Sequence, residues 1–451
     1  MLDKVEKDYG LIDYIFGGFE RRYKDFVPLI KLHIYNRLTY SVSVHQINNT
    51  YPLELYRYLG FRDIPSPRTL NRTLERLGEH FGLIYPAFQR FLSREDLTDD
   101  IQVIDFTSTY FVGSKAQLGA RGYSRDHRPD RDQVNIGIST GINGIPSAIT
   151  IQKGNVQDKK HMKGILKVLP SVIPENSLLI FDCGANTKAN KEKIRSMSYH
   201  YLTLKAKKKR VYKRYIDYFE RNMDQSVHIK MNEREYFCVR QVKKGETKYI
   251  FFSPDLLKTQ ITQKERKLQR EIDKGNKILR RRKNERHPSD HGWVELVPQL
   301  QKTIIPIDNP YITGIEGFFI LESSIYEEPE KILRLYKERD QAEKFFRNLK
   351  EGIEIHPIRH WKAEGIMGVI LISFLANLII NLTQVNSPKA NDGHKFNVKV
   401  LKKKLMNLSL TVVYPDYGFR FTIISNITPP IEDLFGDFIE KYSDKSLKLR
   451  W

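Results

Sequence analysis

Cysteine is almost absent from this chain of 451 residues, which contains only Cys183 and Cys238. Two cysteines cannot build a disulfide framework or a four-cysteine zinc site, so neither device is expected to stabilise the fold. We also expect no leader for export, because the first residues, MLDKVEKDYG, carry charges of both signs and lack the basic segment followed by an apolar segment of a signal peptide. We therefore predict a cytoplasmic protein.

Long apolar runs are equally scarce. The most apolar stretch, Ile366 to Leu382, is interrupted by Gly368, Ser373 and two asparagines, and it falls short of a membrane span. We interpret this stretch as a buried helix and expect no membrane partner.

Acidic residues are outnumbered, since 54 Asp and Glu stand against 75 Lys and Arg, for a formal net charge of +21. The electrostatic field of so positive a protein favours a polyanionic partner, because each phosphate that Lys or Arg neutralises releases counterions condensed on a nucleic acid. A merely basic protein has the same composition, so charge alone favours nucleic acid without establishing it. The length predicts two or three domains, and 40% apolar residues are enough for their cores.

The first 95 residues or so have helical apolar spacing. Ser66-Pro67 is a typical helix start, and in the helix that follows Arg68 and Arg72 lie off a stripe of leucines. A short helix and a turn before this point complete the pattern of a helix-turn-helix DNA reader. An ordinary amphipathic helix with a solvated basic face explains the pattern equally well.

From Ile101 onward, the spacing of apolar residues changes from that of helices to that of β-strands, and predicted helices then alternate with predicted strands. Three strands, a helix, a strand, a helix and a strand form an α/β layer pattern. Their expected ranges are 101–106, 134–139, 148–152, 158–169, 177–181, 187–197 and 201–204.

That order breaks off over residues 206–310, which we interpret as an inserted domain. This segment contains a hairpin-like pair of strands and two basic runs, Lys207 to Arg210 and Arg280 to Lys283. The core is expected to resume with a strand at Gly317 to Leu321 and one helix from about Ser324 to Lys350.

Two aspartates stand out in the predicted strands. Asp105 lies inside an apolar strand, where a bare charge is costly to bury, and Asp182 directly follows another. Each alone has a structural explanation, in which a strand-end aspartate caps the next turn. Together they predict a ligand site at the strand ends.

The late helix adds a third carboxylate. At about 100° per residue, Tyr336, Arg339, Glu343 and Lys350 fall within an arc of roughly 60° that borders the apolar stripe. Charges on that side need a partner or a metal. The alternative is a structural ion pair between Arg339 and Glu343, four residues apart on the helix surface.

Asp105, Asp182 and Glu343 together offer only hard oxygen ligands, which suit Mg²⁺ or Mn²⁺. Two such ions about 4 Å apart activate a water or a 3′-hydroxyl and stabilise the leaving oxygen of a phosphodiester. Tyr336, Arg339 and Lys350 are then expected to bind phosphates beside the scissile bond.

The spacing Tyr336-x2-Arg339-x3-Glu343-x6-Lys350 resembles the Tyr-Arg-Glu-Lys signature of a large group of bacterial insertion-sequence DDE transposases. The resemblance covers roughly residues 50–385. It implies an α/β fold with a ribonuclease H-like catalytic core, which carries the first Asp on the first strand, the second after the fourth strand and the Glu on a late helix. It also implies an insertion before Glu343.

Basic and aromatic residues supplement the carboxylates. The loop from Gly122 to Arg131 contains Arg125 and Arg128, and its place after the first strand favours a DNA-backbone groove over a merely solvated loop. Trp293 and Trp361 are candidates to stack on an extruded base, although a core or interface position is the more common use of tryptophan.

The predicted protein is a transposase that cleaves insertion-sequence ends with two Mg²⁺ or Mn²⁺ ions and transfers the strand to target DNA. Its partners would be double-stranded DNA with terminal inverted repeats and a second copy of the chain, within the bacterial nucleoid. A nuclease or resolvase on the same fold and an inactive, domesticated DNA-binding protein are the alternatives. The expected division is a helical DNA-binding region (1–98), the core (99–205 and 311–385), the insertion (206–310) and a helical C-terminal dimerisation region (386–451).

Overall fold

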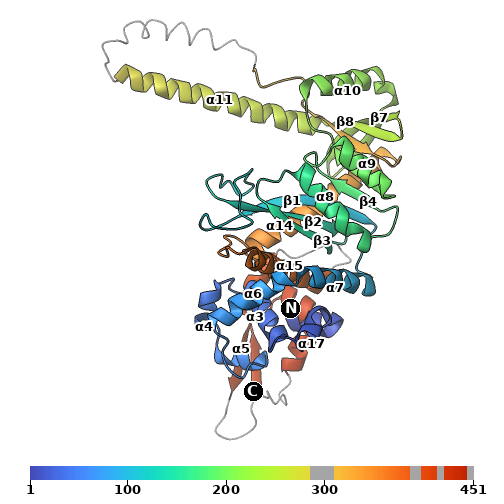
Figure 1. The fold of residues 1–451 in the computed structure, drawn as a ribbon. Helices are drawn as coiled ribbons and strands as arrows, with labels where there is room; N and C mark the ends of the chain where they lie inside the picture. Colours follow the sequence, from blue (N-terminus) through green and yellow to red (C-terminus); the bar gives the residue numbers. More distant parts are fainter. Residues whose placement is uncertain (285–308, 386–397, 414–420, 444–451) are drawn as a thin grey trace. The chain divides into compact units, whose positions relative to one another are not determined.

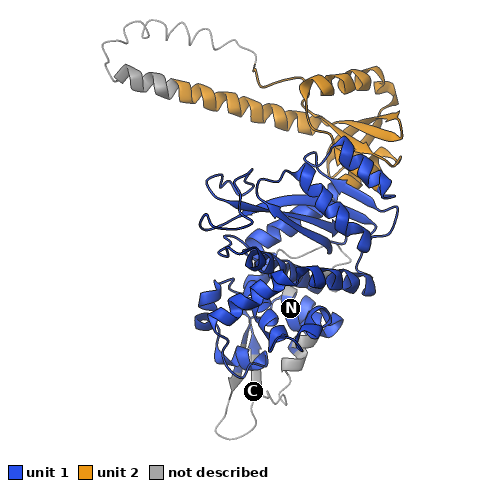
Figure 2. Ribbon diagram, viewed as in Figure 1, with its two compact units in different colours: residues 1–199, 337–451 blue, residues 200–336 orange. Residues whose placement is uncertain are grey.

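The computed structural model describes residues 1–284, 309–385, 398–413 and 421–443. Two compact units make up the chain: unit 1 comprises residues 1–199 and 337–451, and unit 2 comprises residues 200–336 (Figure 2). Trp293 lies outside the described residues, as do the side chains of Arg280 to Lys283. Unit 2 contains the segment that the sequence marks as an insertion.

The N-terminal part of unit 1 is helical. Ser66 caps the sixth helix, because its Oγ accepts a hydrogen bond from the Thr69 amide at 3.2 Å, and Pro67 occupies the first helical position. The α-helices of this part are α1 (Leu2–Tyr9), α2 (Leu11–Phe16), α3 (Phe26–Leu38), α4 (Ile47–Thr50), α5 (Leu53–Tyr58), α6 (Pro67–Glu79) and α7 (Phe81–Arg94).

Helix α15 (Ala363–Val385) is the core helix that the sequence predicts. It is long and apolar enough to cross a membrane by length and composition, but 89% of its most apolar window is buried inside the molecule. Figure 1 shows it between the N-terminal helices and the sheet of unit 1. Its Phe374 packs against Phe88 of α7 and against Phe345, with ring centroids 5.3 and 5.9 Å apart.

Two glycines allow α6 and α15 to cross closely. A Cβ atom on Gly78 would lie 2.0 Å from the Glu364 carbonyl oxygen, and one on Gly368 would lie 2.0 Å from the Leu74 carbonyl oxygen. Any side chain at either position would push the two backbones apart.

The sheet of unit 1 has the order β3-β2-β1-β4. β1 runs antiparallel to β2 and parallel to β4, with Ile104 opposite Phe181. These strands are β1 (Ile101–Tyr110), β2 (Gln133–Gly141), β3 (Pro146–Lys153) and β4 (Leu178–Phe181), and the helices that follow β3 and β4 are α8 (Asp158–Val168) and α9 (Lys188–Ser196).

The sheet of unit 2 is antiparallel throughout, with the order β5-β9-β8-β7-β6. Its core contains Tyr212, Phe219, Val239, Ile250 and Ile320. The elements of unit 2 up to β9 are β5 (His200–Leu204), α10 (Lys209–Arg221), β6 (Val227–Met231), β7 (Arg234–Lys243), β8 (Glu246–Phe252), α11 (Pro254–Asn284) and β9 (Phe318–Ser323).

The prediction of one helix from Ser324 to Lys350 is wrong. The segment forms α13 (Pro329–Lys337), α14 (Asp340–Arg347) and a π-helical turn (Asn348–Gly352). Residues 337–340 are all charged and present no apolar side chain to the core, and the Gln341 amide bonds to the Glu338 carbonyl at 2.9 Å in a tighter turn. Tyr336 consequently belongs to unit 2, while Arg339, Glu343 and Lys350 belong to unit 1.

The C-terminal region is also not purely helical, contrary to the prediction. A two-stranded antiparallel sheet separates its helices, because Thr411, Val412 and Val413 are β-branched and pair with Phe421, Thr422 and Ile423. The described elements are α16 (Val398–Asn407), β10 (Ser409–Val413), β11 (Phe421–Ser425) and α17 (Pro429–Ser443).

Candidate active site

The register of two parallel strands brings the two aspartates together. Asp105 follows Ile104 and Asp182 follows Phe181, and Ile104 and Phe181 are partners across β1 and β4. Neighbouring strands lie about 4.8 Å apart, so the two aspartate backbones are adjacent. Both side chains line one cavity of about 350 Å³.

Glu343 of α14 lines the same cavity. Side chains of a strand alternate between its faces, and Phe106 packs against His161 of α8 with ring centroids 4.9 Å apart. Asp105 therefore points away from α8. The structure thus places all three carboxylates of the predicted triad around one space.

Burial is the main influence on Asp105. It raises the pKa of this carboxyl from 3.8 to about 6, against the opposing effects of a 2.8 Å hydrogen bond from the Phe106 amide and of the charges of Arg339 and Arg125. Carrying a negative charge here costs free energy, so a nearby cation is favoured.

Arg339 supplies such a cation. Its Nη1 lies 3.2 Å from Asp182 Oδ1, and its Nη2 lies 2.5 Å from Glu343 Oε1. The ion pair between Arg339 and Glu343, which the sequence analysis kept as an alternative, is therefore present. The guanidinium also joins two carboxylates of the triad.

Arg125 reaches the cavity from the loop after β1. Its amide donates to Ser108 Oγ at 3.0 Å, and its Nη2 contacts Asp158 Oδ2 at 2.7 Å. Asp158 is not among the predicted site residues, although an acidic residue that starts a helix after a Gly-Asn turn is a usable signal in the sequence. A Cβ on Gly184 would lie 2.7 Å from Asp158 Oδ2, so Gly184 leaves room for this pair.

The other predicted DNA-binding residues do not line this cavity. Lys350, on the π-helical turn, forms an ion pair with Asp126 at 2.5 Å. Arg128 pairs with Asp130 at 2.9 Å and lies over the Tyr110 ring. Two further arginines, Arg68 and Arg72, are exposed on α6, and Tyr336 ends unit 2.

A divalent cation fits the donor set but needs a rearrangement. Carboxylate oxygens are the ligands that Mg²⁺ and Mn²⁺ prefer. Among the described residues, however, no three His, Cys, Asp or Glu side chains are grouped closely enough to hold an ion. Arg339 bridges Asp182 and Glu343, so ligation by both requires its guanidinium to move.

The family model described as "Transposase DDE domain" matches residues 96–379, and the chain belongs to that family. Asp105, Asp182 and Glu343 all lie within the matched residues. No curated protein matches the chain.

The solved structures that are similar to the chain include two transposase complexes with DNA. One is the piggyBac transposase synaptic complex with hairpin DNA, with 9% identity, 94% of this chain and 74% of that chain covered, and a TM-score of 0.43. The other is the Mos1 transposase paired-end complex with the left transposon end, with 14% identity, 40% and 58% covered, and a TM-score of 0.18.

Proposed function

We propose that this transposase belongs to the bacterial insertion-sequence group with the Tyr-Arg-Glu-Lys signature, and that it cleaves element ends and joins them to target DNA. The observation that carries the proposal is the register of β1 and β4, which sets Asp105 beside Asp182 in a cavity that Glu343 also lines. The strand order β3-β2-β1-β4 with a parallel β1 and β4 supports a ribonuclease H-like core.

The three carboxylates are proposed to hold two Mg²⁺ or Mn²⁺ ions, which would supply an activated nucleophile and stabilise the leaving oxygen. The raised pKa of Asp105 favours a cation at that carboxylate. Arg339 is proposed to leave the carboxylates and bind a phosphate beside the scissile bond. Arg125, which lines the same cavity, is proposed to bind the same strand.

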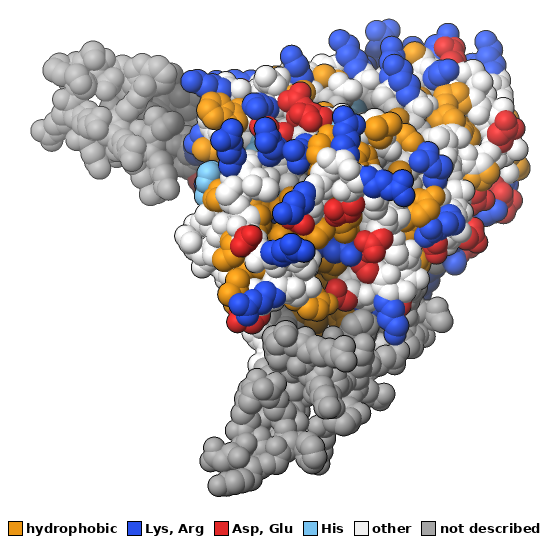
Figure 3. Space-filling model, turned by 60° about the horizontal axis from the view of Figure 1, so that its bottom comes forward, with side chains coloured by type: hydrophobic (Ala, Val, Ile, Leu, Met, Phe, Trp, Pro, Cys, Tyr) orange, Lys and Arg blue, Asp and Glu red, His pale blue; other side chains and the backbone are white. Residues whose placement is uncertain are grey.

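DNA binding is proposed to use dispersed contacts. On the face drawn in Figure 3, Lys and Arg side chains are spread among acidic and apolar ones and form no continuous patch of one sign. The overall charge of +21 supplies sequence-independent affinity. We propose that a homodimer binds the terminal inverted repeats.

The test is a cleavage assay on duplexes that span the inverted repeats, with Mg²⁺ and a denaturing gel. Asp105→Asn, Asp182→Asn and Glu343→Gln should each abolish cleavage while leaving DNA binding within a few-fold of wild type, because the carboxylates perform chemistry and the basic surface supplies affinity. Glu330→Gln, an exposed carboxylate of α13 that does not line the cavity, is the matched control.

The same gel separates the alternatives. Cleavage without any product joined to target DNA would indicate a nuclease. Binding without cleavage by the wild-type protein would indicate a domesticated DNA-binding protein. Near-normal cleavage by one of the three variants would remove that residue from the proposed triad.

A further inference from the structure

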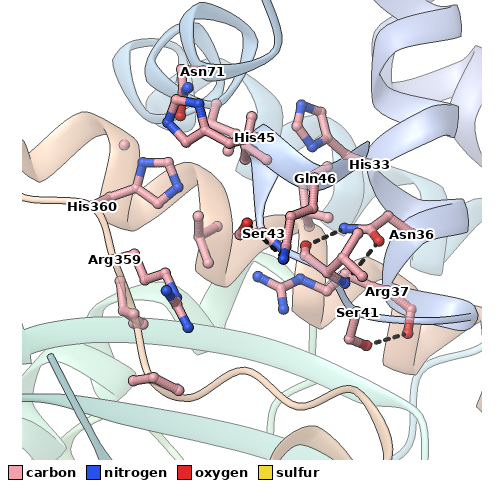
Figure 4. A pocket seen from close by; sticks show the side chains of 18 of the residues that line it. His33, Asn36, Arg37, Ser41, Ser43, His45, Gln46, Asn71, Arg359 and His360 are labelled. Atoms are coloured by element: carbon pink, nitrogen blue, oxygen red, sulfur yellow. Dashed lines mark hydrogen bonds between the residues drawn. The ribbon is translucent and has the colours of Figure 1, made fainter. Parts of the chain in front are cut away.

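A second cavity of unit 1, of about 560 Å³, is separate from the carboxylates. It is bounded by α3, by the 3₁₀ turn Val44–Gln46, by α6 and by the segment 354–362. Figure 4 shows polar side chains entering it from all of these elements, among them His45, Asn71 and Arg359. Nothing in the proposed chemistry uses this cavity.

Two arginines reach into it from opposite sides. Arg37 extends from α3 and Arg359 from the segment before α15 (Figure 4). Within the described residues neither guanidinium forms an ion pair, and Arg37 donates to the backbone carbonyl of Glu354 at 3.1 Å. Two like charges that face a common space favour an anion between them.

The remaining charged groups of the cavity do not cancel this pair. Lys362 forms an ion pair with Glu75 at 3.0 Å, and the exposed Glu354 is the other carboxylate of the lining. Burial lowers the pKa of His33 and of His360 to about 4, so both rings are neutral at pH 7. Three cations therefore stand against two carboxylates.

The segment that carries Arg359 is held firmly. The Ile358 amide donates to the Tyr110 carbonyl at 3.0 Å, and the Val112 amide donates to the Ile358 carbonyl at 3.1 Å. The Gln117 amide bonds to the Trp361 carbonyl at 2.8 Å. Because these hydrogen bonds already order the segment, binding of a ligand to its side chains would cost little further conformational entropy.

Two exposed aromatic side chains also line the cavity. Trp361 is 63% exposed and Tyr40 is 55% exposed, and both line the cavity. Trp361 therefore does not pack in the core, which together with an interface position is the more common use of tryptophan. Exposed aromatic rings beside cations suit a nucleic-acid strand, whose sugars and bases stack on the rings while its phosphates meet the charges.

The distance to the carboxylates can be derived from β1. Asp105 and Tyr110 are five residues apart on this strand, or about 17 Å at about 3.3 Å per residue. Tyr110 is hydrogen-bonded to Ile358 at the edge of the cavity. One strand of DNA advances about 3.4 Å per nucleotide, so 17 Å corresponds to about five nucleotides.

We propose that this cavity binds the DNA backbone about five nucleotides from the scissile phosphate, with Arg37 and Arg359 on a phosphate and Trp361 against the neighbouring sugar or base. This inference rests on the proposed function, because it places the same DNA strand in both cavities. It adds a second point of attachment, which fixes the register of the cut.

The test combines Arg359→Ala with DNA that carries one uncharged methylphosphonate at successive positions. In wild type, a methylphosphonate about five nucleotides from the cut should weaken binding, and Arg359→Ala should be insensitive at that position. The slope of log affinity against log salt should also fall by about 1 in this variant. Arg90→Ala is the matched control, since Arg90 is exposed on α7 and does not line the cavity.

The outcomes are distinct. If the wild type cuts the DNA while Arg359→Ala keeps both the wild-type salt slope and the wild-type methylphosphonate pattern, the backbone site is wrong and the proposed function stands. If the wild type neither binds nor cuts, both proposals fail. If free dAMP raises the melting temperature of the wild type but not of Arg359→Ala, and no methylphosphonate position matters, the cavity is a nucleotide site and the backbone proposal is overturned.

Discussion

Arg339 Nη1 lies 3.2 Å from Asp182 Oδ1, so a guanidinium at the start of α14 neutralises the carboxylate at the end of β4. The same group contacts Glu343 Oε1 at 2.5 Å. In this arrangement Arg339 occupies the electrostatic role that a divalent ion would take. Metal and guanidinium are therefore expected to compete for the same carboxylates.

Arg339→Gln should strengthen binding of Mn²⁺ in the absence of DNA by about tenfold, because the removed cation no longer repels the ion or competes for its ligands; tenfold corresponds to about 1.4 kcal/mol. The measurement is a Mn²⁺ titration followed by electron paramagnetic resonance. Arg334→Ala, which breaks an exposed pair with Glu330 on α13, should leave Mn²⁺ binding unchanged. Weaker Mn²⁺ binding by Arg339→Gln would show that the arginine orients the carboxylates instead of competing for them.

Lys350 and Asp126 form a pair with only 16% and 10% of their side chains exposed. Lys350→Met should lower the free energy of unfolding by about 2–4 kcal/mol, because it leaves the Asp126 carboxylate buried without its cation. The double variant Asp126→Asn with Lys350→Met should recover more than half of that loss. Urea denaturation of wild type, Lys350→Met, the single variant Asp126→Asn and the double variant measures the coupling. If the loss in the double variant equals the sum of the losses in the two single variants, the ion pair contributes no stability.

Gly368→Ala should destabilise unit 1 by about 1–3 kcal/mol, because the new Cβ would meet the Leu74 carbonyl oxygen at 2.0 Å and backbone atoms cannot rotate away. Gly275→Ala provides the contrast. That position lies in α11 with no atom near the added Cβ, so alanine should be neutral or stabilising by up to about 1 kcal/mol. Thermal melting of both variants checks the prediction, and equal melting temperatures would refute the close crossing of α6 and α15.

Glu316 makes the stability of unit 2 depend on pH. Burial alone would raise the pKa of Glu316, but the hydrogen bond with Lys264 and those with Thr313 lower it from 4.5 to about 2. A lowered folded-state pKa means that the stabilisation is complete above pH 4.5 and is lost as the pH falls toward 2.

Glu316→Gln should therefore reduce the free energy of unfolding by about 2 kcal/mol at pH 7, the typical value of hydrogen bonds to a charged group. The difference from wild type should shrink between pH 4.5 and pH 2. Denaturation at several pH values measures it, with Glu328→Gln, on an exposed side chain, as the control. A difference that is constant with pH would assign the loss to packing and not to charge.

Much of the local structure follows from the sequence. The strand-like spacing of apolar residues from Ile101 onward predicts β1 to β3, and Ser66-Pro67 marks the start of α6. These features depend on neighbours a few residues apart, whose steric and hydrogen-bonding preferences are the same in any fold. The two aspartates are conspicuous for the same reason, since each interrupts or ends an apolar strand.

Tertiary structure alone decided the rest. The spacing of a single helix would place Arg339 and Lys350 on one face. In the structure, Arg339 lies at the start of α14 and Lys350 lies in the π-helical turn after it. Arg339 forms an ion pair with Asp182, whereas Lys350 forms one with Asp126. The second cavity joins residues that are more than 300 positions apart, such as Arg37 and Arg359. Long-range ion pairs and cavities depend on how complete elements pack, which the spacing of residues within one element does not specify.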